Sequence, residues 1–165
     1  MTDEQKLQTI IHSLQEFALR DIKLINQQTN PEFPLATFIL CSCFLDQMSG
    51  FRYNNNNVGY RYKQFIIDYM PQYDAEKIYR DIRCRLVHNY STTKFFSLTR
   101  HDPRHLHWYV TIVILSATHF ILDIENAFQQ FSNDILKDPK AKRNAIAWYD
   151  KYNILQMGAN LSSLI

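Results

Sequence analysis

The sequence predicts a mainly helical fold, organised as a single domain over residues 1–165. Apolar residues recur at helical spacing in several long segments, and only three glycines and five prolines interrupt the chain. A hydrophobic content of 46% is enough to form one proper core, whereas 165 residues are too few to favour two. We therefore expect a helical bundle around one core.

The first expected helix ends near Gln27 or Gln28. Its apolar side chains recur three or four residues apart, which is typical of one buried helical face: Leu7, Ile10, Ile11, Leu14, Phe17, Ala18, Ile22 and Ile25. The Asn30-Pro31 and Phe33-Pro34 dipeptides then break the helix.

A second helix is expected from about Pro34 to Gly50. It is apolar on most of its circumference, which predicts a central position, and Gly50 is its expected stop. The asparagines at 54–57 predict a connecting loop. A short third helix, around Tyr62 to Tyr69, should then end before Pro71.

A fourth helix should begin after Asp74, which is a good N-cap. At 100° per residue, its apolar residues form one stripe that should face the core: Ala75, Ile78, Tyr79, Ile82 and Leu86. From about 94 to 109 the pattern alternates in two short segments around Asp102-Pro103, which predicts a short β-hairpin or a folded-back extended loop.

Two further helices should complete the chain. The first is expected from Trp108 to Phe131, and the second from about Pro139 to Met157 with Gly158 as its stop. The remaining Ser162-Ser163 region is expected to be a fraying tail.

Three cysteines without paired spacing predict neither a disulfide framework nor a zinc site. Cys41 and Cys43 are interpreted as small buried apolar residues. The polar start of the chain is unlike a signal peptide, and the apolar runs at 35–45 and 108–124 are too short to span a membrane. We expect a cytoplasmic protein that needs no metal or other cofactor.

The formal charge of +2 is unevenly distributed. Between Lys77 and His107 there are seven basic and two acidic residues, a local charge of +5, and four of the six histidines lie in the same window. This zone suggests binding of phosphate or RNA. Its candidate contacts are Arg80, Arg85, Lys94, Arg100 and Arg104. A solvated basic surface is the alternative.

The segment Arg83 to Tyr90 concentrates the candidate chemistry. On the ideal wheel, Arg83 and Tyr90 flank the apolar stripe on one side, whereas Arg83 and His88 diverge by about 140° and should not touch. They could act together only if the helix ends near 86–88, or if a second copy supplies the facing residue. A guanidinium grips phosphate and an imidazole moves protons near neutral pH, a pair that suits RNA cleavage without metal.

The spacing Arg-x-x-x-x-His-x-Tyr, filled by Arg83, His88 and Tyr90, resembles the signature of the HEPN superfamily. The resemblance implies a helical bundle that forms a homodimer, with the two motifs making a metal-independent endoribonuclease site. Arg83 would bind the scissile phosphate, and His88 would act in proton transfer or leaving-group stabilisation. In the toxin branch, Tyr90 would be modified by a nucleotidyltransferase-type antitoxin, and the adjacent Asn89 is a supporting candidate.

Other interpretations remain open. His88 could simply stabilise the C-terminal end of a helix dipole, Arg83 could pair with a carboxylate such as Asp46, and Tyr90 could pack. The whole protein could also be a non-catalytic HEPN-like module that binds RNA, a nucleotide or a partner protein.

Overall fold

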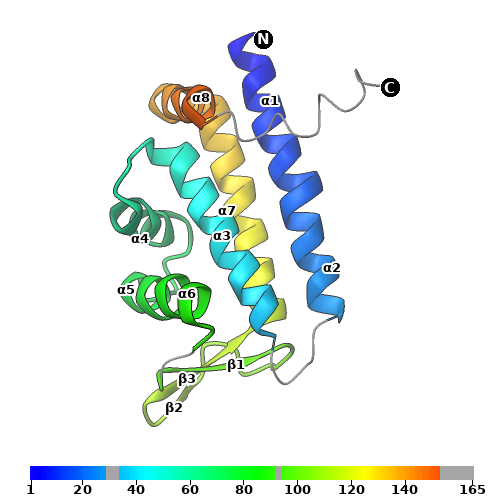
Figure 1. Ribbon diagram of the computed structural model, residues 1–165, viewed down its shortest axis with the longest axis vertical. Helices are drawn as coiled ribbons and strands as arrows, with labels where there is room; N and C mark the ends of the chain where they lie inside the picture. Colours follow the sequence, from blue (N-terminus) through cyan, green and yellow to red (C-terminus); the bar gives the residue numbers. More distant parts are fainter. Residues whose placement is uncertain (29–33, 92–93, 153–165) are drawn as a thin grey trace.

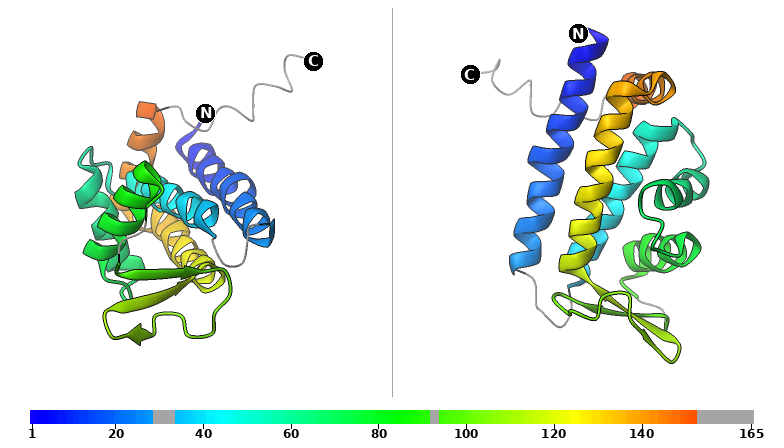
Figure 2. Two further views of the ribbon diagram at one scale, coloured as in Figure 1. Left: turned by 60° about the horizontal axis from the view of Figure 1, so that its bottom comes forward. Right: turned by 180° about the vertical axis from the view of Figure 1, so that it is seen from behind.

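The computed structural model describes residues 1–28, 34–91 and 94–152, and within them the protein is mainly helical with one small sheet. Three long helical segments lie side by side, and the sheet covers one of their ends (Figure 1). Figure 2 shows the same arrangement from two further directions. The predicted fold class, mainly α with a short β element, is therefore confirmed.

The first long segment consists of α1 (Asp3–Ser13), the π-helical η1 (Leu14–Leu19) and α2 (Arg20–Gln28). Thr2 caps it through a capping box, because its hydroxyl accepts from Gln5 N–H while the Gln5 side chain accepts from Thr2 N–H. The segment is described to Gln28, so its predicted end borders residues that are not described. The predicted break at 30–34 falls mostly on residues 29–33, which lie outside the described residues.

The central helix α3 (Leu35–Tyr53) packs against α4 (Val58–Tyr69), α7 (Ala117–Lys137) and α8 (Pro139–Tyr152). Its predicted end at Gly50 is wrong. The helix ends instead at Tyr53, and the Asn54 that caps it adopts a left-handed φ of 45°. Gly50 has a packing role, because a Cβ there would lie 2.5 Å from the Trp148 indole on α8.

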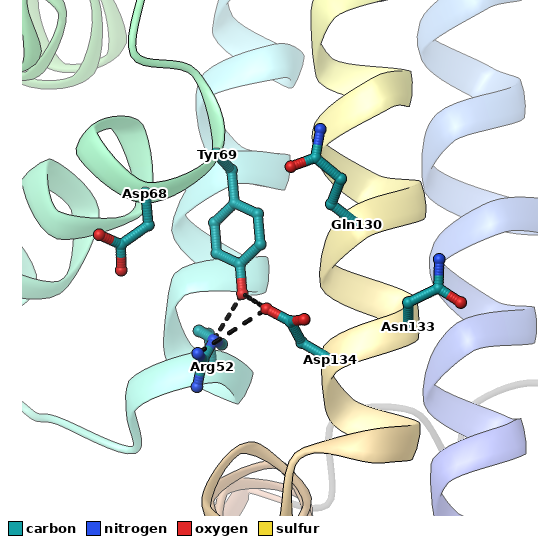
Figure 3. A pocket seen from close by; sticks show the side chains of 6 residues that line it. All are labelled: Arg52, Asp68, Tyr69, Gln130, Asn133 and Asp134. Carbon is teal, nitrogen blue, oxygen red and sulfur yellow. Dashed lines mark hydrogen bonds and ion pairs between the residues drawn. The ribbon is translucent and has the colours of Figure 1, made fainter.

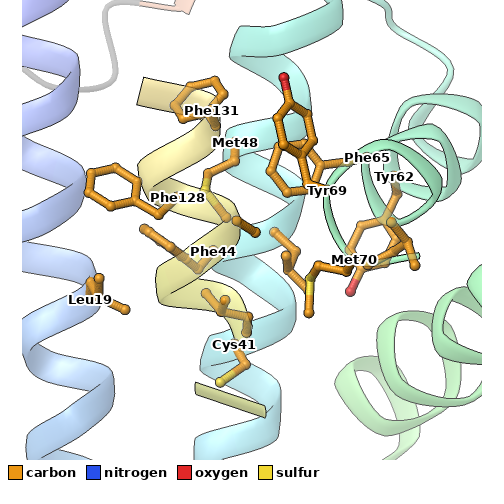
Figure 4. Close-up of a cluster of buried hydrophobic side chains, with 14 of the residues drawn as sticks. Leu19, Cys41, Phe44, Met48, Tyr62, Phe65, Tyr69, Met70, Phe128 and Phe131 are labelled. Atoms are coloured by element: carbon orange, nitrogen blue, oxygen red, sulfur yellow. The ribbon is translucent and has the colours of Figure 1, made fainter. Parts of the chain in front are cut away.

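The core fills the space between α3, α4 and α7. Phenylalanine, methionine and aliphatic side chains from these helices interdigitate there, and Figure 4 shows part of this cluster, including Phe44, Met48, Phe65, Phe128 and Phe131. All five are buried. The helix expected from about Pro34 is apolar around most of its circumference, which predicts a central position. This helix is α3, and it takes that position.

The sheet contains β1 (Phe96–Thr99), β2 (Trp108–Tyr109) and β3 (Ile112–Ser116). Its order is β1-β3-β2, with β3 parallel to β1 and antiparallel to β2. The predicted strands near 94–109 are thus present but pair with β3 rather than with each other. The observed hairpin joins β2 to β3.

Two predicted helix boundaries change. The helix expected from Trp108 begins at Ala117, because the β-branched run before it forms the central strand β3, and it continues beyond Phe131 to Lys137. A short apolar run of this kind can be either a buried strand or a helix. The last helix is described to Tyr152, and its predicted end at Met157 and Gly158 lies outside the described residues, as does Ser162-Ser163.

Candidate functional site

One continuous helical segment carries the predicted motif. It comprises α5 (Ala75–Lys77), the π-helical η2 (Ile78–Leu86) and α6 (Val87–Asn89). Asp74 caps it by accepting from Lys77 N–H at 3.1 Å, as predicted. The predicted apolar stripe is also confirmed: Ile78, Ile82 and Leu86 are buried, while Ala75 and Tyr79 pack against the core.

Arg83 and His88 are in direct contact. Arg83 Nη1 lies 2.7 Å from His88 Nε2. The prediction that these side chains diverge is wrong, because the wheel assumed an α-helix. Arg83 lies in the π-helical η2, whose hydrogen bonds run from i to i+5, and His88 lies in α6, two residues beyond its end. The stretch that joins them is therefore wound more widely than the ideal wheel assumes. Arginine can only donate, so His88 accepts through Nε2 and carries its proton on Nδ1.

Asp46 on α3 holds the other side of Arg83. Arg83 Nη2 donates to Asp46 Oδ2 at 2.8 Å, and Arg61 Nη2 on α4 donates to Oδ1 at 2.5 Å. Burial disfavours the charged guanidinium, but the Asp46 bond and charge outweigh it and raise the pKa of Arg83 above its usual value. The pairing of Arg83 with Asp46, one of the alternatives that the sequence left open, is therefore present. The three helices together present a fixed cation beside a neutral imidazole.

Asn89 and Tyr90 end the segment. Asn89 is the last residue of α6 and is exposed. Tyr90 follows with a left-handed φ of 50° and is also exposed. The wheel placed Tyr90 beside the core, but the helix ends before it, so the wheel does not apply there.

The basic candidates occupy different settings. Arg80 pairs with the buried Asp81, and Arg104 pairs with Asp102, whose pKa is lowered to about 2 chiefly by the hydrogen bonds from Arg104. Arg85 and Lys94 are exposed. Arg100 is half-buried and lines a separate cavity of about 410 Å³ with Lys23 and His101. Asp81 and Asp102 are the two acidic residues already included in the local charge of +5, so their ion pairs leave that net charge unchanged.

A second polar hollow lies between α3, α4 and α7, with a volume of about 460 Å³. In it the Tyr69 hydroxyl accepts from Arg52 Nε and donates to Asp134 Oδ2, both at 2.5 Å (Figure 3). Burial, and then the bond to Asp134, raise the pKa of Tyr69. Sequence reasoning did not find this cluster, since its residues come from three distant segments. Its groups already satisfy one another.

Three imidazole rings stack where the sheet meets α7. The His119 ring lies 6.0 Å from that of His101 and 5.4 Å from that of His105, at interplanar angles of 17° and 15°. His105 Nδ1 accepts from Ser116 N–H at 3.0 Å, which leaves the proton on Nε2, 2.7 Å from the Tyr73 hydroxyl. The sequence grouped His101 and His105, but it offered no signal for His119 on another element.

The cysteines divide by environment. Cys41 is buried, as predicted, and burial strongly raises the pKa of its thiol. Cys43 is exposed, so its predicted burial is wrong, because it lies on the solvent side of α3. Within residues 1–28, 34–91 and 94–152, no cluster of three or more His, Cys, Asp or Glu side chains is arranged to hold a metal ion.

Comparison of the chain with protein-family models, curated proteins and solved structures gives no match. None of the helices in the described part of the chain combines the length and apolar character needed to cross a membrane.

Proposed function

We propose that the protein is a metal-independent endoribonuclease of the HEPN type, with Arg83 and His88 as its catalytic pair. The observation that carries this proposal is the 2.7 Å contact between Arg83 Nη1 and His88 Nε2. This contact places a cation that can bind phosphate, Arg83, beside a group that can accept a proton, His88. HEPN-type function also implies a homodimer, and the exposure of Tyr90 supports its accessibility to a nucleotidyltransferase-type antitoxin.

The chemistry follows from the two groups. When a phosphodiester binds, Arg83 Nη1 turns from His88 to a non-bridging phosphate oxygen and stabilises the charge that develops there. His88 Nε2 is then free to accept the proton of the 2′-hydroxyl as that oxygen attacks phosphorus. The bond from phosphorus to the 5′-oxygen breaks, and the 5′-oxygen takes a proton from solvent. The products are a 2′,3′-cyclic phosphate and a 5′-hydroxyl end.

Asp46 and Arg61 would act as positioning residues. Asp46 keeps one edge of the Arg83 guanidinium in place while the other edge turns to substrate. Arg61, in turn, is held by Asp46, by the carbonyl of Asn55 at 3.0 Å and by the Trp148 ring 4.9 Å away. These contacts fix the carboxylate between two cations.

The test is cleavage of single-stranded RNA in EDTA by the purified full chain. We expect 2′,3′-cyclic phosphate ends, with Arg83→Ala and His88→Ala each lowering the rate by about 100-fold or more. Arg143→Ala, which removes an exposed arginine on α8, should cut normally. No cleavage, or cleavage that survives both active-site variants, would refute the proposal. Light scattering of the same preparation tests the expected dimer.

A non-catalytic binding module is the second candidate. It is favoured by the fact that both terminal nitrogens of Arg83 are already engaged, by His88 and Asp46. Such a module would bind RNA, a nucleotide or an acidic partner in a salt-sensitive way without turnover. Salt-sensitive binding combined with intact RNA would select this candidate.

A further inference from the structure

We propose that the β2–β3 hairpin is a stacking platform for single-stranded RNA, with Trp108 and Tyr109 as its base-binding side chains. This inference rests on the proposed function, since it names the substrate class that would reach the Arg83 site. The platform is defined here as Trp108, Tyr109 and Val110. Figure 1 shows this hairpin at the end of the bundle, below the α5–α6 segment.

The platform is unusually exposed for its composition. Trp108 is 55% exposed, Tyr109 56% and Val110 96%. Three consecutive large apolar side chains open to solvent are uncommon on a surface without a binding role. Trp108 and Tyr109 lie on an edge strand, because β2 pairs with β3 on one side only. Successive strand residues point to opposite faces, so both faces of β2 offer an aromatic ring.

The rings are held in place by contacts on one side. The Trp108 indole meets Phe95 edge-on, with ring centroids 5.4 Å apart. The Nζ of Lys77 lies 5.3 Å from the Trp108 centroid and 4.1 Å from that of Phe95. A ring supported in this way loses little freedom when a base stacks on its exposed part.

The tip of the hairpin has a strained backbone. Val110 adopts a φ of 54°, a left-handed conformation that β-branched residues rarely take. The register pairs Tyr109 with Ile112, so Val110 and Thr111 form the two-residue loop. Strain of this kind concentrates at contact and functional sites. The strained residue here is a valine whose side chain has almost no intramolecular packing.

Cations beside the rings favour nucleic acid over an apolar protein partner. Lys77, which also pairs with Asp74, lies against Trp108. The Arg104 guanidinium, which pairs with Asp102, lies 5.9 Å from the Tyr109 ring centroid. Alternating aromatic rings and cations match the alternating bases and phosphates of a single strand. In duplex RNA the base faces are already stacked and cannot use these rings.

Lys77, which contacts Trp108 of the platform, lies on the same helical segment as the catalytic pair. Lys77 is the last residue of α5, and Arg83 follows six residues later in η2. A single strand of a few nucleotides could therefore contact both. The platform would supply sequence-independent binding, while the Arg83 site would act on the phosphate.

The test uses the full chain and a mixed-sequence RNA 12-mer methylated at every 2′-oxygen, which cannot undergo attack by a 2′-hydroxyl. Binding is measured by anisotropy of a 3′-fluorescein label, and stacking by quenching of tryptophan emission with an unlabelled strand. The chain has two tryptophans, and Trp148 is only 5% exposed, so quenching reports on Trp108. Thermal melts check that each variant is folded.

Trp108→Ala should weaken binding about tenfold and abolish the quenching, whereas Trp108→Phe should keep most of the affinity without the quenching. Tyr60→Ala, which removes a tyrosine of matched 52% exposure on α4, should change neither. Unchanged affinity in folded Trp108→Ala, equal affinity for duplex RNA, or no RNA binding would overturn the platform, the last outcome pointing to a protein partner.

The two proposals fail separately. If Trp108 binds the methylated strand but unmodified RNA stays intact, the endonuclease proposal fails and the platform stands. If cleavage depends on Arg83 but neither binding nor KM responds to Trp108→Ala, the platform fails and the endonuclease proposal stands.

Discussion

Asp46 and Arg83 are joined across two helices by a 2.8 Å hydrogen bond, and the second oxygen of the same carboxylate binds Arg61. One acidic side chain on α3 thus holds cations from both α4 and η2. The bond fixes the guanidinium on which the proposed catalysis depends. It also ties together three helices, so stability and activity can be measured through the same residue.

Replacing Asp46 by Asn should destabilise the fold by about 1–2 kcal/mol. The change leaves two partly buried guanidiniums facing a neutral amide, and the remaining solvent access moderates the cost. Urea unfolding at pH 7 measures the effect. Asp68→Asn is the control, because that exposed carboxylate bonds only to Tyr53 and Gln64 among the described contacts. Equal losses in the two variants would contradict the bridging role.

Arg83→Lys should separate geometry from charge. A lysine keeps the positive charge, but its single ammonium cannot present the flat, two-sided edge that meets both His88 and Asp46. We expect RNA cleavage to fall at least about tenfold, while the free energy of unfolding changes by less than about 1 kcal/mol. Arg143→Lys, at an exposed arginine on α8, should leave the rate unchanged. A fully active Arg83→Lys variant would show that charge alone suffices.

The two helical glycines should respond oppositely to alanine. At Gly50 a new Cβ would lie 2.5 Å from the Trp148 indole, so overpacking should cost about 1–3 kcal/mol despite the better helix propensity of alanine. At Gly59 the nearest atom is the movable Tyr79 hydroxyl at 3.1 Å, so the change should be neutral or slightly stabilising. Thermal unfolding of both variants tests this contrast.

Trp148→Phe supplies a second check on the same contact. The smaller ring should relieve part of the clash, so Gly50→Ala should cost less in that background than in the natural chain. Strict additivity of the two changes would mean that the close approach of α3 and α8 does not limit stability.

Acid stability should depend on Asp123. Burial acts to raise the pKa of this carboxyl, but hydrogen bonds from His105 and Tyr73 outweigh it and lower the pKa. A lowered folded-state pKa stabilises the protein above the unfolded value, near 3.8, and this contribution is lost as pH falls through the lower folded value. Asp123→Asn should therefore destabilise the protein at pH 7 and flatten the decline in stability as the pH falls below about 4.

Urea unfolding from pH 7 to pH 2 measures this dependence. Asp21→Asn serves as the control, because its side chain is mostly exposed and pairs only with the neighbouring Arg20 among the described contacts. The same acid dependence in natural and Asp123→Asn chains would rule out the Tyr73–Asp123–His105 network as its source.

Much of the helical framework follows from periodicity and capping. The stripe of Ile78, Ile82 and Leu86 and the cap at Asp74 were predictable, because they depend only on neighbours in sequence. The strand β3 was not, since a short apolar run is equally consistent with a buried helix. Its identity depends on pairing with β1, which lies across a crossover.

The sequence identified residues of the candidate site but did not predict how they are arranged. Residue types and spacing singled out Arg83 and His88, and pairing of Arg83 with Asp46 was foreseen. The Arg83–His88 contact was missed because the wheel assumed α-helical rotation. The histidine stack was missed because His119 belongs to α7, and only tertiary structure brings it between His101 and His105.

Arg83 and His88 are five residues apart, and this interval brings them into contact because the backbone of η2 is wound as a π-helix. A chain with one residue fewer between the same two groups would bring them together in an ordinary α-helix, where residues four apart are neighbours. Related sequences with a shortened interval could therefore build the same pair with a different helix.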